Sequence, residues 1–520
     1  MFRLLIGLVC TSFFAVHAQP PAIGQNGVVN SASQIPPTLA GGALARGARF
    51  HIQGVRLTGS EATSVILSRG AVSVNAQILS ATPLAIEAIV PRNAPLGAVE
   101  IRVGRGSETS ALFPVTILQA NPGFYSRNGS GWGPGRAQNL QPNRRDNTIN
   151  DPARPSESVA ILATGTGGVT PDVFVGSKRA KVLRIEPSAE PGDEVIVLEI
   201  PRTAPEGCFV PVYAREREPD AAPSNTITVS IRRSIGGCRM PPEFPVPLFN
   251  SRTTGMIVIS RASGLSENGR GKWTDDDAVA AFVKRDATPP NAPLLLTPPV
   301  GTCTVYTGSS QSNFEMPVTI SDGLLADLGG EGLDVGPALN LSNGQEMRVV
   351  PSTPAAPGFY RAPLGNSESR RRPLFLNPGS VNLASAGSRN AGAFDLKLQV
   401  TPAFTWTNRD AIVEVDRHRP LTLTWTSANP SEVKLILAMN VDQLTTSRAM
   451  CYCVASGAAG KFTIQPDFLA NFPPSRDIPG EPLNQLMIAE PMVHAPVTIP
   501  GIERVQAMTM FANVRIVRYR

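Results

Sequence analysis

Apolar and polar side chains alternate with a period of two residues in many parts of this chain. The clearest alternation lies in five segments, residues 72–78, 99–103, 227–231, 394–400 and 421–425. A period of two is typical of strands that bury one face and expose the other. Helical spacing competes only at residues 275–283, where Val279 and Phe282 fall on one side, so a short helix is expected there. The pattern otherwise predicts an all-β protein.

One eight-residue phrase occurs twice in the N-terminal half. It reads Val-Pro-Arg-Asn-Ala-Pro-Leu-Gly at residues 90–97 and Ile-Pro-Arg-Thr-Ala-Pro-Glu-Gly at residues 200–207, and each copy lies between two strand-like runs. The spacing of about 110 residues is the size of one small β-sandwich. We therefore expect two related sandwiches, at residues 26–118 and 150–233. Pro91 and Pro201 should occupy the same turn in both.

Boundaries between these units follow from composition. Residues 119–149 are rich in Gly, Asn and Arg and are expected to link the two sandwiches. Residues 239–247 contain four prolines and should form an extended linker. The rest divides by expectation into three parts: residues 248–300 with the short helix, a β-rich domain at 301–400 and a β-sandwich-like domain at 401–520.

The first eighteen residues have the pattern of a cleavable export signal. Arg3 is followed by an apolar stretch over residues 4–16 and by the small-residue site Val16-His17-Ala18. This pattern is typical of a signal peptide. The stretch is shorter than the roughly 20 residues that span a bilayer, and no later segment is long and apolar enough. We expect a secreted or cell-surface protein with no membrane span.

Composition and charge narrow the class further. The chain has 520 residues, 49 Pro, 46 Gly and 17% charged residues, which suits several domains of short strands joined by turns. The net charge of +6 is spread along the chain. The densest basic runs, Arg144-Arg145 and residues 370–372, lie in polar stretches that read as solvated loops. A nucleic-acid partner is therefore not expected.

Six cysteines are present, and Cys10 leaves with the signal. In an exported protein the remaining cysteines are first of all disulfide candidates. Cys208 follows the second copy of the phrase and Cys238 follows the last strand of that sandwich, so we expect them to pair. In the C-terminal half we favour Cys303 with Cys453, and the odd count leaves one thiol over. Cys-Tyr-Cys at residues 451–453 lacks the spacing and further ligands of a zinc site. We expect neither metal nor cofactor.

Several phrases are shared with a known group of domains. In the N-terminal half they lie at residues 28–33, 50–57, 121–125 and 163–167. On these phrases the first 233 residues resemble tandem IPT/TIG immunoglobulin-like domains of secreted acidobacterial proteins of the Solibacter type. The C-terminal half resembles the β-rich region that often follows such pairs, on phrases at residues 333–337, 391–394, 404–408, 421–425 and 459–464. The resemblance implies tandem immunoglobulin-like β-sandwiches followed by further β-sandwich domains, and an exported location. It brings no catalytic residues.

Groups of residues that could carry chemistry are scarce. Residues 275–277 are three consecutive Asp that could bind calcium, but the later Gly and Glu of an EF-hand loop are absent, which favours a solvated helix start. The mature chain has only His51, His418 and His494, far apart, and no Gly-x-Ser-x-Gly motif for a hydrolytic triad. A pair of carboxylates for sugar hydrolysis stays open, because its members can lie far apart in sequence. We expect no catalytic site.

The remaining candidate is a contact residue for a ligand. Trp132 lies in the loop sequence Asn-Gly-Ser-Gly-Trp-Gly-Pro-Gly, where an exposed indole could contact a ligand. The sequence thus favours a non-enzymatic scaffold or adhesion protein whose loops bind an extracellular protein or a polysaccharide at a cell surface or in a matrix. The alternative is a carbohydrate-directed extracellular enzyme or enzyme accessory, with its function in residues 248–520.

Overall fold

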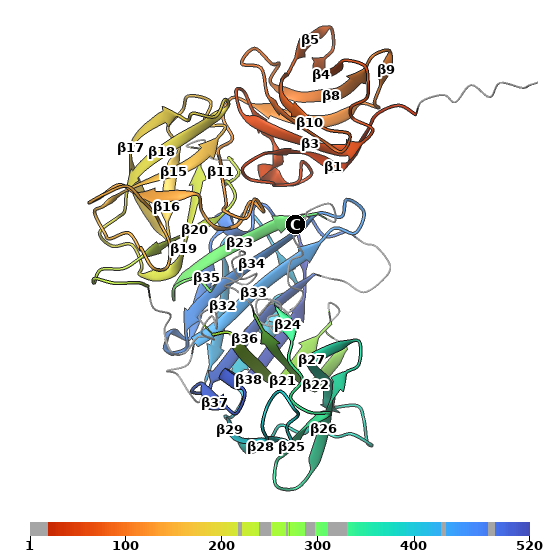
Figure 1. The fold of residues 1–520 in the computed structure, drawn as a ribbon, viewed down its shortest axis with the longest axis vertical. Coiled ribbons are helices and arrows are strands. Elements are labelled where there is room, and N and C mark those ends of the chain that lie inside the picture. Colours follow the sequence, from red (N-terminus) through yellow and green to blue (C-terminus); the bar gives the residue numbers. More distant parts are fainter. Residues whose placement is uncertain are drawn as a thin grey trace, which may run out of the picture.

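The computed structural model of the chain is an all-β protein in three parts, which confirms the fold class expected from the pattern (Figure 1). It describes residues 19–216, 221–238, 251–266, 269, 271–285, 297–309, 330–427, 433–476 and 484–520. The expected signal at residues 1–18 and the linker at 239–247 lie outside this range. Within the described range the only helical turns are short 3-10 turns. No helix there has the length and apolar character to cross a membrane.

The first module is a sandwich of two sheets. One sheet has the order β1-β3-β7-β6, from β1 (Ala22–Asn30), β3 (Arg49–Val55), β7 (Ala85–Ile89) and β6 (Gln77–Ala81). The other has the order β2-β10-β8-β4-β5, from β2 (Leu44–Ala45), β10 (Phe113–Leu118), β8 (Gly97–Arg105), β4 (Thr63–Arg69) and β5 (Val72–Asn75), with β9 (Glu108–Thr109) beside β8. Fully buried Phe50, Ile52, Leu67 and Ile101 fill the space between the sheets.

The second module begins earlier than expected, because residues 123–146 fold into it. Its order is β12-β20-β19-β16-β17-β18-β15-β13-β14, with β11 beside β15. The strands are β11 (Gly123–Phe124), β12 (Gly133–Pro134), β13 (Ala137–Asn139), β14 (Arg145–Asp146), β15 (Ser158–Thr164), β16 (Asp172–Val175), β17 (Lys178–Pro187), β18 (Asp193–Glu199), β19 (Gly207–Arg215) and β20 (Ile227–Ile231). The expectation that residues 119–149 are only a linker is therefore wrong. Their short strands pair with β15 and β20, which are distant in sequence.

The two modules are built on one plan. β3 pairs with β7 as β15 pairs with β18, and the parallel pair of β2 and β10 has its counterpart in β12 and β20. The repeated phrase forms the turn between β7 and β8 and again between β18 and β19. In the first turn Ala94 donates its N–H to the carbonyl of Pro91 at 3.0 Å, and in the second Ala204 donates to Pro201 at 2.9 Å. Pro91 and Pro201 thus occupy the same turn.

In both turns an arginine donates a hydrogen bond to the carbonyl of the equivalent alanine. Arg46 Nε donates to the Ala94 carbonyl at 2.7 Å, and Arg233 Nη2 donates to the Ala204 carbonyl at 3.0 Å. The first arginine precedes its phrase in the chain and the second follows it. Each turn thus has an arginine that satisfies this carbonyl, and the two modules supply it from different strand ends.

The C-terminal region is organised around a single 14-stranded sheet. The strand order is β23-β34-β33-β36-β38-β21-β22-β27-β26-β25-β28-β29, with β24 beside β22 and β37 beside β38. The strands are β21 (Thr253–Leu265), β22 (Lys272–Lys284), β23 (Thr302–Gly308), β24 (Glu331–Gly332), β25 (Ala338–Ser342), β26 (Met347–Thr353), β27 (Ala356–Asn366), β28 (Gly379–Ser385), β29 (Phe394–Val400), β33 (Val433–Val441), β34 (Arg448–Ser456), β36 (Gln485–Val493), β37 (Val497–Ile499) and β38 (Ile502–Ile516).

Two small sheets complete this region. One has the order β30-β32-β35 and the other pairs β31 with β39; the strands are β30 (Thr405–Trp406), β32 (Leu421–Thr426), β35 (Lys461–Ile464), β31 (Glu414–Val415) and β39 (Arg518–Tyr519). Trp406, Trp425 and Leu423 belong to the same buried cluster as Ile257 and Ile436 of the large sheet. The small sheet β30-β32-β35 thus contributes to the core on one face of the large sheet.

Two expectations for the C-terminal half are wrong. One sheet contains strands from all three expected parts, namely from residues 253–284, 302–308, 331–400 and 433–516. The chain therefore does not divide into domains at residues 301 and 401. The expected helix at 275–283 is part of β22, a central strand between β21 and β27. The last part of β22 is buried on both faces, because Ala280 to Val283 are consecutive core residues. Such a run cannot be told from a buried helix by periodicity alone.

Two of the three aspartates of β22 pair with different arginines. Asp276 is fully buried and binds Arg261 of β21 through both carboxylate oxygens, at 2.7 and 2.8 Å. It also accepts the backbone N–H groups of Phe375 and Leu376, at 2.6 and 2.9 Å. Asp277 points to the opposite face, where it pairs with Arg361 at 3.5 Å. The expected solvated helix start is thus a strand, and Asp276 has a structural role.

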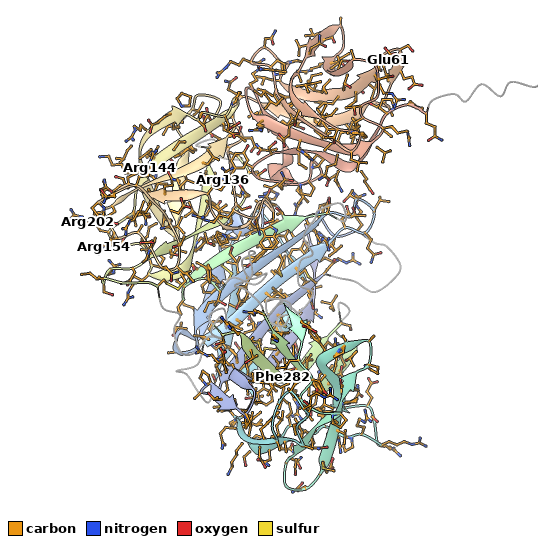
Figure 2. The ribbon with its side chains drawn as sticks, in the orientation of Figure 1. Glu61, Arg136, Arg144, Arg154, Arg202 and Phe282 are labelled. Carbon is orange, nitrogen blue, oxygen red and sulfur yellow. A yellow bond between two sulfur atoms is a disulfide. The ribbon has the colours of Figure 1, made fainter. Side chains whose placement is uncertain are left out.

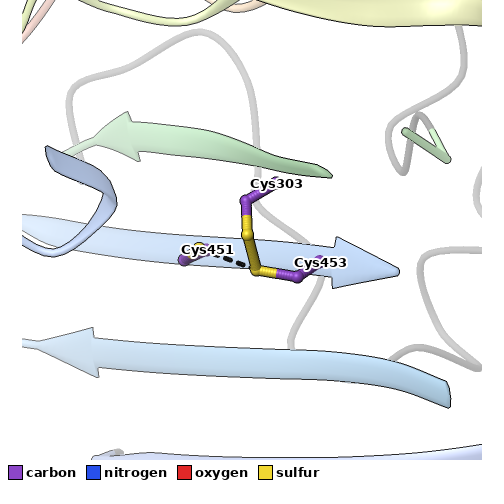
Figure 3. Close-up of side chains that lie close together, drawn as sticks. All are labelled: Cys303, Cys451 and Cys453. Carbon is purple, nitrogen blue, oxygen red and sulfur yellow. Dashed lines mark hydrogen bonds between the residues drawn. A yellow bond between two sulfur atoms is a disulfide. The ribbon is translucent and has the colours of Figure 1, made fainter. Parts of the chain in front are cut away.

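Both disulfides named from the sequence are present. Cys208 bonds to Cys238 with Cα atoms 5.4 Å apart, and Cys303 of β23 bonds to Cys453 of β34 with Cα atoms 4.0 Å apart. Cys451 is the cysteine left over; its Sγ lies 3.5 Å from that of Cys453, as Figure 3 shows. Burial raises the pKa of the Cys451 thiol, so it stays protonated and unreactive. The three sulfurs lie within 4.8 Å of one another, but the disulfide leaves a single thiol for any metal.

The two modules lie next to each other at one end of the C-terminal region (Figure 1). Asn471 joins all three parts: its Oδ1 accepts from Gly41 N–H at 2.7 Å and its Nδ2 donates to the Pro223 carbonyl at 3.1 Å. Tyr213 of the second module stacks on Phe174 at 5.1 Å and meets Phe468 of the C-terminal region edge-on at 5.5 Å. These buried contacts fix the three parts relative to one another.

Replacement of Asp276 by Ala should strongly destabilise the C-terminal sheet. The substitution leaves Arg261 and two backbone N–H groups buried without their acceptor, which costs about 3–5 kcal/mol. Asp277→Ala is the matched control, because its carboxylate is about one third exposed and such pairs are worth at most about 1 kcal/mol. Urea unfolding followed by tryptophan fluorescence measures both. Equal losses in the two variants would contradict this role.

Candidate functional site

The residues singled out from the sequence do not form a site. Trp132 is only 3% exposed and packs edge-on against Tyr306 of β23, with ring centroids 5.0 Å apart. The expectation of an exposed ligand contact at Trp132 is therefore wrong, because its loop is covered by the C-terminal sheet. His51 lies in β3, whereas His418 and His494 lie in different parts of the C-terminal region. The described residues thus do not bring the histidines together.

A groove on the outer face of the second module is the candidate site. Its volume is about 450 Å³ and its lining residues are Arg127, Arg136, Ala137, Gln138, Arg144, Asp146, Ala160, Leu162 and Val195. Arg127 lies in the loop after β11, Arg136 and Arg144 immediately precede β13 and β14, and the other residues lie on β13, β14, β15 and β18. We call this set the arginine groove.

The alternation of β15 and β18 produces an apolar floor. Val159, Ile161 and Ala163 of β15 point into the core of the module, so Ala160 and Leu162 point outward. Ala160 lies opposite Gln138 of β13, and Leu162 lies opposite Val195 of β18. The floor is therefore set by strand register and does not depend on loop conformation.

One wall of the groove is held by Asp146. Its carboxylate accepts from Arg127 Nη1 and from Gln138 Nε2, both at 3.2 Å. The hydrogen bonds from Gln138 and Arg127 outweigh partial burial and lower the pKa of Asp146. The carboxylate is thus ionised at neutral pH, and the charge of Arg127 is already matched.

The other two arginines of the groove have no such partner. Among the described residues, neither Arg136 nor Arg144 forms an ion pair, and both are exposed. The guanidinium of Arg136 lies over the ring of Tyr125 at 5.9 Å from its centroid. Figure 2 labels both arginines on the second module. The groove therefore offers two guanidinium groups to an anionic ligand.

A polar network below the groove reaches the first module. The Tyr125 hydroxyl donates to Asp193 Oδ1 at 2.6 Å, and Arg49 Nη1 of the first module donates to Asp193 Oδ2 at 3.2 Å. Burial and the adjacent carboxylate raise the pKa of Tyr125, so the phenol stays a donor. The ring below Arg136 is thus held by Asp193 of its own module, and Asp193 is in turn bound by Arg49 of the first module.

The same arginine organises the first module's side of the interface. Arg49 Nε donates to Glu87 Oε2 at 3.1 Å, and Ser31 donates to the same oxygen at 3.0 Å. His51 Nδ1 lies 3.1 Å from the other oxygen of Glu87. Glu87 thus holds three neighbouring side chains at the junction of the two modules.

The sequence contained a weak signal for this groove. Arg144 and Arg145 stood out as a basic pair but were interpreted as part of a solvated loop. In the structure Arg145 pairs with Asp151 at 2.8 Å and Arg144 lines the groove. The alternation of Arg136 and Gln138 on one side with Ala137 on the other is a strand pattern. This pattern is only three residues long, and the strand that pairs with β13, β15, begins about twenty residues later in the sequence.

The chain matches no protein-family model and no curated protein. Among solved structures it is similar to SGBP-B of a Bacteroides ovatus mixed-linkage glucan utilization locus, with 10% identity, 78% of this chain and 79% of that chain covered, and a TM-score of 0.14. SGBP-B from a xyloglucan utilization locus in Bacteroides uniformis has 12% identity, coverages of 74% and 94%, and a TM-score of 0.20. A Ca²⁺-stabilized adhesin from an Antarctic bacterium has 9% identity, coverages of 97% and 99%, and a TM-score of 0.13. At these scores the similarity carries no inference about function.

The junction of the modules should weaken in acid through Glu87. Burial alone would raise the pKa of Glu87, but the hydrogen bonds from His51 and Ser31 outweigh burial and lower it. A carboxylate whose pKa is lower in the folded than in the unfolded protein stabilises the fold. This stabilisation is complete at any pH above the pKa of the unfolded state, here near 4.5. That stabilisation is lost as the pH falls through the folded-state pKa.

The variant Glu87→Gln isolates this contribution. At pH 7 it should unfold with a free energy about 1–3 kcal/mol below that of the unchanged protein, and the difference should shrink below pH 4.5. Glu186→Gln is the control, because Glu186 pairs with Arg184 on the exposed surface. Denaturant titrations from pH 3 to pH 7 provide the measurement. If the difference in unfolding free energy between Glu87→Gln and the unchanged protein stayed constant over this pH range, the charge of Glu87 would not contribute to stability.

Proposed function

We propose that this protein is an exported, non-enzymatic binding protein that holds an extended extracellular polymer in the arginine groove. The observation that carries the proposal is the groove itself, an open depression of about 450 Å³. Its floor is apolar, and two exposed guanidinium groups in its lining form no ion pair with the described residues. A ligand could meet all of these groups without any rearrangement of the strands below them.

The surrounding fold supports a binding role. The floor residues lie on β15 and β18, whose register fixes them, and rigid strands position contacts better than loops do. The second module is held against the C-terminal sheet by Trp132 and Tyr213, and against the first module by Arg49. The groove therefore has a fixed orientation relative to the whole molecule.

The type of module and the location are part of the same proposal. We assign the two modules to the IPT/TIG type on their shared plan, their repeated turn and the phrases quoted from the sequence. Export is supported by the N-terminal pattern of residues 1–18 and by the two disulfides, since disulfides persist mainly in oxidising compartments. A protein of this kind would act outside the cytoplasm, where polysaccharides and matrix polymers are available.

Blocking the groove should abolish binding without unfolding the module. Leu162→Trp places an indole on the outward face of β15, where it fills the floor. Leu183→Trp is the matched control, because Leu183 lies on β17 outside the groove and is 40% exposed. On an array of glycans and matrix polymers, the unchanged protein should bind at least one polymer, and Leu162→Trp should bind it at least tenfold more weakly. Full binding by Leu162→Trp, or no binding by the unchanged protein, would refute the proposal.

A further inference from the structure

We infer that the arginine groove is selective for an acidic polysaccharide that carries a carboxylate on its sugars, a polyuronate. The inference rests on the proposed function and names the class of its ligand. It depends on three features of the groove: which charges are unpaired, how far apart they lie, and what lies between them.

The unpaired charge of the groove is cationic. Asp146 is the single carboxylate of the lining and already binds Arg127 and Gln138. Arg136 and Arg144 remain without an ion pair in the described chain. A guanidinium group binds a carboxylate through two parallel hydrogen bonds, and such charge-assisted bonds are about twice as strong as neutral ones. Carboxylates on the ligand would therefore be well matched by the free arginines of this groove.

The two free arginines lie at opposite ends of a short hairpin. Gln138 of β13 lies opposite Asp146 of β14. Arg136 lies two positions before Gln138, and Arg144 lies two positions before Asp146. Because the two strands run in opposite directions, the arginines lie on opposite sides of this pair. The arginine Cα atoms are thus about four positions apart, or roughly 13 Å along the strands. A chain with several carboxylates can therefore bind the two guanidinium groups through carboxylates on different sugars.

The groups between the arginines favour a sugar over a nucleic acid. The carboxylate of Asp146 lies between the two cations, where it can accept a hydrogen bond from a sugar hydroxyl. None of the lining residues is aromatic, so the groove lacks the stacking surface on which proteins hold single-stranded bases. A polyuronate supplies both the carboxylates and the hydroxyls that these walls can bind.

A peptide added as a further strand is disfavoured on the floor of the groove, although β14 is the outermost strand of this sheet. Peptides that lie along a sheet usually add a strand to a free edge. β15 is paired on both sides, with β13 and β18, and β13 is paired with β14 and β15. The floor of the groove therefore exposes side chains and no unpaired backbone, which suits a ligand bound through its own side groups.

The test compares polygalacturonate with its fully methyl-esterified form, which has the same sugars without the charge. We expect the full-length mature protein to bind polygalacturonate at least tenfold more tightly than the ester. The double variant Arg136→Gln/Arg144→Gln should lose at least tenfold in affinity. The control Arg154→Gln/Arg202→Gln removes the same charge from the same module, at two exposed arginines that lie away from the groove (Figure 2). It should bind within about twofold of the unchanged protein.

Each other outcome identifies what has failed. Equal binding of the ester and the acid would overturn the inference and leave the proposed function standing, because a neutral polymer would then be the ligand. Tighter binding of poly(dT) or poly-glutamate than of polygalacturonate at the same salt concentration would overturn the ligand class. Equal losses in the two double variants would show a general charge effect and overturn the site. Binding of none of these polymers, nor of any on the array, would overturn the proposed function as well.

Discussion

The covered edge of the large sheet is the constraint on which the rest of the structure depends. β23 is the outermost strand of the 14-stranded sheet, and all seven of its residues are buried. An exposed, apolar edge strand would pair with other chains. Here the second module covers it: Trp132 packs on Tyr306, and Tyr213 packs between Phe174 and Phe468. The second module thus covers this edge and also carries the arginine groove.

This arrangement places the groove in a chain of contacts that spans two modules. Arg136 lies over Tyr125, Tyr125 donates to Asp193, and Asp193 accepts from Arg49 of the first module. A side chain fixed by several neighbours loses less freedom when it binds a ligand. The first module, which contributes no lining residue, can in this way influence affinity at the groove.

The sequence predicted the structure correctly where a strand or turn is determined by local or repeated residues. The alternation of residues 99–103 and 227–231 marks β8 and β20, and the repeated phrase marks equivalent turns in two modules that share one plan. Prediction from the sequence failed where packing between distant segments determines the structure. Ala280 to Val283 lie in a strand that is buried on both faces, and Trp132 lies in a glycine-rich loop that becomes buried only against Tyr306. The groove was missed for the same reason, since Arg136 and Arg144 line it only because β13 and β14 fold back onto β15.

The position of β38 in the large sheet determines when this region can fold. β38 spans Ile502–Ile516 and lies between β36 and β21, with a parallel register to β21 over twelve residue pairs. Parallel pairing of segments about 250 residues apart carries a high loop-closure cost and forms slowly. The sheet cannot close until β38, its last long strand, has been synthesised and is free to pair. Until then β21 and β36 lack the strand that pairs with both of them, and such unpaired edges are sites of aggregation in the incomplete chain.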